Sequence, residues 1–145
     1  MLTESKKVIG LHGSSTTNAA TATGAIDTLD WDHALVDVVL ATSSAVTTKP
    51  TVLKLQESAT TDASNYSDLS GAVGGTDFTI PNMKTQGESI VRFNVSKAKK
   101  PHKRYLRGVV SPATTQIISI TAELFRGDES PSTAAKAGVE TLVNV

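Results

Sequence analysis

The sequence has no cysteine and few aromatic residues, which make up 4% of its 145 positions. Without cysteine, disulfide scaffolds, thiolate zinc sites and cysteine nucleophiles are excluded. The scarcity of aromatic rings disfavours a platform on which sugars stack, for which Trp31, Tyr66 and Tyr105 are the obvious candidates. No apolar run approaches the length of about 18 residues that a membrane-spanning helix requires, so we predict no membrane contact.

The chain also lacks an excess of either charge, because 14 Lys and Arg residues balance 14 Asp and Glu residues. Long-range attraction of the whole molecule to DNA or to anionic membranes is therefore not expected. One stretch departs from this balance: Lys97 to Gly108, KAKKPHKRYLRG, holds six Lys and Arg residues and no acidic residue.

A nucleic-acid site needs phosphate contacts spread over a groove-sized surface and aromatic rings on which bases stack. Only Tyr105 lies within the basic stretch, and no second basic segment supports it. Because charge runs are usually solvated, we interpret the stretch as an exposed hairpin tip. Docking to an acidic protein partner is the main alternative and nucleic-acid binding the weaker one; no nucleic-acid partner is predicted.

What the sequence does contain is a series of short segments with alternating apolar residues, and about a quarter of its residues are Ser or Thr. Period-two alternation and β-branched residues favour strands. The segments span residues 8–11, 33–41, 49–58, 78–81, 88–96, 103–111 and 114–126. Seven or eight strands with turn residues between them predict an all-β antiparallel sandwich or barrel, in which 88–96 and 103–111 form a hairpin around Pro101.

The composition divides the chain into three parts. Residues 1–25 contain the polar stretch SSTTNAATATGA and are predicted to form an extended N-terminal arm. Residues 26–131 hold the strong strand signals and are assigned to the β-sandwich domain. Residues 132–145 are predicted to form an extended C-terminal tail or a short helix.

Catalytic motifs are not evident. The three histidines, His12, His33 and His102, are far apart and have no partner at helical spacing. The segment Asp27–His33 carries three aspartates and one histidine but lacks the residue order of a calcium loop. We interpret it as a polar turn before a strand, with Trp31 against the edge of the core. We therefore predict no catalytic residue, no metal, no cofactor and no enzymatic activity.

Four segments, in this order, resemble a group of small head decoration, or cement, proteins of tailed bacteriophages. They are IDTLDWDHALVDVVL, VLKLQESATTDASNYSDLSGA, KRYLRGVV and IISITAELFRGDESP, and the resemblance covers Ile26 to Pro131. It implies a jelly-roll-type sandwich that sits as a homotrimer on the outer surface of the capsid. It further implies a structural virion protein that binds major capsid protein subunits and stabilises the shell.

The alternative is a carbohydrate- or receptor-binding β-sandwich exposed on the virion. For the capsid-binding role, the first choice of contact is the N-terminal arm, lying along the shell or adding to a neighbouring sheet. The second choice is the tip of the basic stretch. The predicted contact residues are Leu2, Lys6, Lys7, Val8, Ile9, Leu11, Lys99, Lys100 and Lys103.

Overall fold

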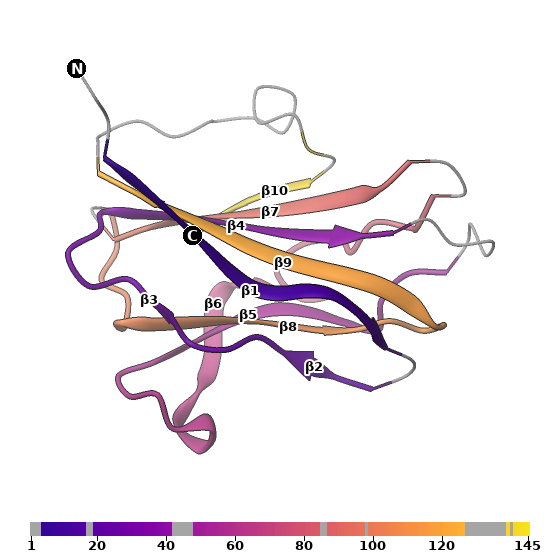
Figure 1. Ribbon diagram of the computed structural model, residues 1–145, viewed down its shortest axis with the longest axis horizontal. Coiled ribbons are helices and arrows are strands. Elements are labelled where there is room, and N and C mark those ends of the chain that lie inside the picture. Colours follow the sequence, from indigo (N-terminus) through magenta and orange to yellow (C-terminus); the bar gives the residue numbers. More distant parts are fainter. Residues whose placement is uncertain are drawn as a thin grey trace.

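The computed structural model describes residues 4–16, 19–41, 48–84, 87–97, 99–126, 139 and 141–145. These residues form ten strands and one short 3₁₀-helix, η1 (Figure 1). The elements are β1 Ser5–Thr16, β2 Thr21–Ala22, β3 Ile26–Asp27, β4 His33–Leu40, β5 Val52–Ser58, η1 Ala63–Asn65, β6 Ser67–Val73, β7 Ser89–Ser96, β8 Tyr105–Ser111, β9 Gln116–Phe125 and β10 Thr141–Asn144. Among the described residues there is no helix long and apolar enough to cross a membrane.

The strands form two sheets that pack face to face with the core between them (Figure 1). Sheet A has the order β1-β9-β4-β7-β10, and sheet B has the order β2-β8-β5-β6, with β3 also paired to β8. All pairs are antiparallel except β10 with β7, which is parallel. The predicted all-β antiparallel sandwich is confirmed.

Alternation along each strand explains why the sheets bury one face. In β4, the side chains of Ala34, Val36, Val38 and Leu40 are buried, whereas those of Leu35, Asp37 and Val39 point away from the core. The same period holds in β9, where every second residue is buried. The inward residues of both sheets meet around Phe93, whose ring packs edge-to-face on Phe78 at 5.5 Å between centroids.

The chain crosses between the sheets at most of its connections, and this corrects the predicted hairpin of 88–96 with 103–111. β7 lies in sheet A between β4 and β10, and β8 lies in sheet B beside β5. Both strands bury an apolar face, and these faces meet across the core from opposite layers. A hairpin would instead place both strands in the same layer.

The sandwich also extends beyond the predicted boundaries at 26 and 131. β1 forms an edge of sheet A beside β9, and β2 joins sheet B beside β8, so both strands lie within the predicted arm. Val8 and Leu11 of β1 pack against the core. Within the predicted C-terminal tail, β10 pairs with β7, and Val143 of β10 and Val145 directly after it are buried. Residues 132–138 and 140 lie outside the described residues.

Candidate functional site

Each sheet has one face turned away from the core, and these two outer faces carry the candidate contact residues. On the outer face of sheet A, strand register aligns Ile9 of β1, Thr121 of β9, Asp37 of β4 and Arg92 of β7 in one row across the strands. The adjacent row contains Lys7, Glu123 and Leu35. The face therefore combines apolar side chains with charges of both signs.

A hollow of about 400 Å³ opens on this face. Its floor holds an ion pair in which Arg92 donates from Nε and Nη2 to the two carboxylate oxygens of Asp37, at 2.6 Å each. This hydrogen bonding raises the pKa of Arg92. The hollow is lined by Lys7, Val8, Ile9, Leu35, Asp37, Arg92, Thr121, Ala122 and Glu123.

Exposed apolar side chains are also concentrated on the outer face of sheet A. Among the described residues, three large hydrophobic side chains are exposed: Ile9 at 67%, Ile117 at 53% and Leu29 at 50%. Ile9 and Ile117 both point outward from sheet A, whereas Leu29 lies in the turn between β3 and β4. A partner that covers this face would remove both isoleucines from water.

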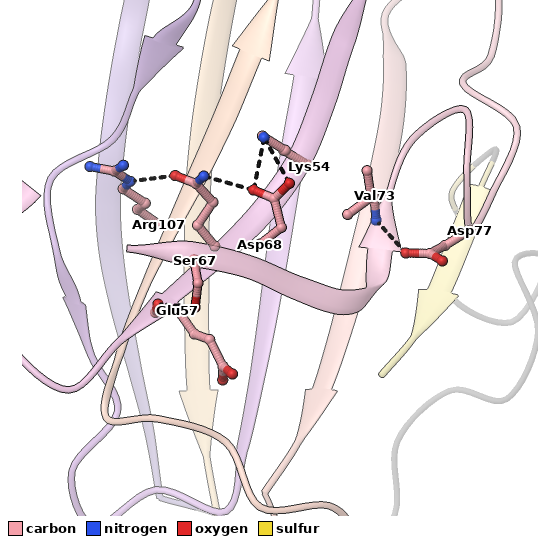
Figure 2. Close-up of polar contacts among 8 residues, drawn as sticks. Lys54, Glu57, Ser67, Asp68, Val73, Asp77 and Arg107 are labelled. Carbon is pink, nitrogen blue, oxygen red and sulfur yellow. Dashed lines mark hydrogen bonds and ion pairs between the residues drawn. The ribbon is translucent and has the colours of Figure 1, made fainter. Parts of the chain in front are cut away.

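The outer face of sheet B carries a chain of polar contacts that runs across three strands (Figure 2). Arg107 of β8 donates from Nε to Gln56 Oε1 at 2.8 Å, and Gln56 Nε2 donates to Asp68 Oδ1 at 2.8 Å. Lys54 Nζ lies 2.8 Å from the same carboxylate. The hydrogen bonds from Lys54 and Gln56 lower the pKa of Asp68.

Two tyrosines flank this polar chain, and each is covered by a guanidinium group. The Arg107 guanidinium lies 4.1 Å from the centre of the Tyr66 ring, and that of Arg104 lies 4.9 Å from the centre of Tyr105. Arg104 is held by Asp27, to which it donates from Nε at 2.8 Å and from Nη2 at 2.6 Å. This hydrogen bonding lowers the pKa of Asp27 to about 2, with a smaller contribution from nearby Lys6.

The basic stretch is more anchored than a solvated tip. Lys97 Nζ donates to the carbonyl oxygen of Thr28. Lys103 donates from its backbone N–H to Glu57 Oε2 and from Nζ to Ser67 Oγ. Lys99, Lys100 and Lys103 are exposed, but the contacts of Lys97 and Lys103 show that the stretch is not a freely solvated tip.

The predicted contact residues fall into different environments. Lys6, Lys7 and Ile9 are exposed on β1, whereas Val8 and Leu11 are half-buried against the core and contribute to packing. Leu2 lies outside the described residues. Lys7 and Ile9 point outward from sheet A, while Lys103 contacts Ser67 of sheet B, so the two predicted contact groups lie on different layers.

The segment Asp27–His33 has a structural role. Asp27 pairs with Arg104, and its Oδ1 also accepts a hydrogen bond from the backbone N–H of Leu29. The ring of His33 is buried and stacks on Phe125 at 5.0 Å. Trp31 packs against the core as predicted. Across the described parts of the chain, no group of three or more potential metal-ligating side chains comes together.

Sequence reasoning missed the Arg92–Asp37 pair, the exposed Ile117 and the contact of Arg107 with Tyr66. The sequence holds a signal for the ion pair and for Ile117, because Arg92, Asp37 and Ile117 all occupy outward positions of alternating strands. The third depends on the pairing of β5 with both β6 and β8, which strand patterns do not specify. Comparison with protein-family models, curated proteins and solved structures found no match.

Proposed function

We propose that this protein is a structural virion protein that decorates the outer surface of a bacteriophage capsid, binds major capsid protein subunits as a homotrimer and performs no catalysis. The outer face of sheet A carries the proposal. This face combines two exposed isoleucines, a hollow and charges of both signs. Apolar contacts surrounded by polar groups are typical of the surfaces with which proteins bind other proteins.

The strand order supports the jelly-roll topology that the sequence resemblance implies. Strands β1, β9, β4 and β7 of sheet A lie opposite strands β2 with β3, β8, β5 and β6 of sheet B. The chain passes from one sheet to the other between β1 and β2, β3 and β4, β4 and β5, β6 and β7, β7 and β8, and β8 and β9. Two interlocked Greek keys of this kind occur in viral capsid and lectin domains. Strand β10 is an addition at the edge of sheet A.

The carbohydrate-binding alternative receives less support. Of its three aromatic candidates, Tyr105 lies on the outer face of sheet B, and Tyr66, the residue before β6, contacts Arg107 on that face. However, an arginine covers one face of each ring, which reduces the aromatic surface open to a sugar. Because one fold serves many functions, the choice between the two roles depends on surfaces rather than on topology.

The proposal is tested by mixing the purified protein with shells assembled from the major capsid protein of the same phage and pelleting the shells. Wild-type protein should co-sediment in a saturable manner. Ile9→Lys and Ile117→Lys should each weaken binding at least tenfold, because each places a charge in the proposed contact. Leu29→Lys is the matched control and should bind like the wild type, since Leu29 is similarly exposed but lies in a turn.

Melting curves of the three variants show whether the substitutions disturb the fold. Wild-type protein that stays in the supernatant would overturn the proposed function. Equal pelleting of all four proteins would instead reject the outer face of sheet A as the contact surface.

A further inference from the structure

The guanidinium group of Arg107 is held in place, but most of its N–H donors have no hydrogen-bond partner among the described residues. Its Nε donates to Gln56 and its plane lies over Tyr66. No hydrogen bond joins Nη1 or Nη2 to any described residue, and no described carboxylate pairs with this arginine. Figure 2 shows these two nitrogens pointing away from the chain of contacts that ends at Lys54.

Arg104, three residues before Arg107, provides a comparison, because its guanidinium group is fully paired with a carboxylate. Two of its nitrogens bind both oxygens of Asp27. Arg107 lacks such a carboxylate, and the nearest acid in its own network, Asp68, is already bonded to Gln56 and Lys54. Lys103 adds a second positive charge beside the stack, because its Nζ bonds to Ser67, the residue after Tyr66.

The chain segment that runs alongside Arg107 carries only small side chains. The pairs Ala22 with Val109 and Ile26 with Leu106 place residues 23–25 alongside residues 107 and 108 of β8. Gly24 and Ala25 are exposed in this segment, and a Cβ atom added to Gly24 would meet no atom within 4 Å. Residues 23–25 therefore place no bulky exposed side chain alongside this part of β8.

We propose that Arg107, oriented by Tyr66 and Gln56, forms a binding site for a carboxylate side chain of an acidic segment from a partner protein. A planar guanidinium with two free Nη groups binds a carboxylate through two parallel hydrogen bonds. Because Gln56 and Tyr66 already fix the plane, little conformational entropy is lost on binding. Arginine and tyrosine are also the residues on which protein interfaces most often depend.

An acidic protein segment fits this surface better than an acidic sugar does. The rings of Tyr66 and Tyr105 each have a guanidinium over one face, so a sugar would find less open ring surface on which to stack. The charge that remains unpaired, on Arg107 and Lys103, calls for a negatively charged ligand. The site lies on the opposite layer from the proposed capsid contact and does not depend on it.

The test is an NMR titration of the ¹⁵N-labelled protein with a tetraglutamate peptide, following the Arg107 Nε–Hε signal. We expect this signal to shift in a saturable manner, and a tetraglutamine peptide to leave it unchanged. Arg107→Lys keeps the charge but loses the two parallel donors and should weaken binding at least tenfold, as followed in this variant and in the wild type through the backbone amide signals of Tyr66 and residue 107. Arg104→Lys is the matched control and should bind like the wild type, because Asp27 already occupies Arg104.

Lys103→Gln, a second variant at an exposed position, should weaken binding less than Arg107→Lys does. The proposal would be overturned if the glutamate peptide left the Arg107 signal of the wild type unchanged. It would also be overturned if Arg107→Lys bound the peptide as tightly as the wild type. A shift caused by tetragalacturonate but not by tetraglutamate would overturn the assignment to a protein segment. None of these outcomes bears on the pelleting of capsid shells.

Discussion

At the scale of single residues, the polar ring of His33 occupies a buried, apolar environment. His33 begins β4 at 1% exposure, stacks on Phe125, and neither ring nitrogen has a hydrogen-bond partner among the described residues. A buried polar group without a partner costs on the order of 1–3 kcal/mol. The position therefore favours a ring of similar shape that carries no polar atom.

We predict that His33→Phe leaves the free energy of unfolding unchanged or raises it by about 1 kcal/mol, as measured by urea denaturation. His33→Ala provides the comparison, because it removes the ring and should destabilise the protein by opening a cavity. Loss of more than about 1 kcal/mol in His33→Phe would show that a ring nitrogen makes a stabilising bond.

Asp27 gives the fold a defined response to acid. Its pKa falls from 3.8 to about 2 in the folded protein, mainly because Arg104 donates hydrogen bonds to the carboxylate. A carboxyl group with a lowered folded-state pKa stabilises the fold when it is ionised, above its unfolded-state pKa. That stabilisation disappears as the pH falls through the folded-state pKa.

The stability difference between wild type and Asp27→Asn should thus be constant near neutral pH and should shrink between pH 3.8 and about 2. Because the ion pair is well exposed, the difference should not exceed about 1 kcal/mol. Urea denaturation at a series of pH values measures it. A difference that persists unchanged at pH 2 would mean that the Asp27–Arg104 pair does not stabilise the fold.

At the scale of elements, β10 shows how a short strand joins the core through two residues. Val143 and Val145 are buried, whereas Leu142, the residue before Val143, points to the outer face beside Arg92. Register alone thus separates neighbouring apolar residues into core and surface.

Val143→Ala should destabilise the protein by about 1.6 kcal/mol, from two buried methyl equivalents at roughly 0.8 kcal/mol each. Leu142→Ala removes a larger side chain but should cost less, because Leu142 is only half-buried. Thermal and urea denaturation of both variants measure the two costs. The reverse order of stability would contradict the parallel register of β10 on β7.

The sequence predicts those strands whose apolar and polar residues alternate. β4, β5, β7, β8 and β9 are evident from their alternation. β6 is not evident from its pattern, because its sequence SDLSGAV contains few β-branched residues and a glycine. Strand β10 has only four residues, and pairing with β7 rather than its own pattern makes it a strand.

The candidate sites were less predictable than the strands, because they depend on which strands are neighbours. Arg92 meets Asp37 only because β7 lies beside β4, and Tyr66 meets Arg107 only because β5 joins β6 to β8. These neighbours are far apart in the sequence. A pattern of alternation shows which residues point outward, but not which of them share a row.

At the scale of the whole molecule, the absence of net charge bears on assembly. With 14 residues of each sign, copies of the chain do not repel one another over long distances. We predict that size-exclusion chromatography with light scattering gives a mass three times that of the 15.1 kDa chain. A mass of one chain at all concentrations would contradict the proposed homotrimer.

The proposed role requires that this sandwich attaches to the outside of a capsid. A cryo-electron microscopy map of the particle to which the proposal assigns the chain tests this attachment. We expect two-layered β-sandwich density on the outer surface of the shell, with sheet A toward the capsid protein and sheet B toward solvent. Density for the sandwich in the tail or inside the shell, or none on the particle, would contradict it.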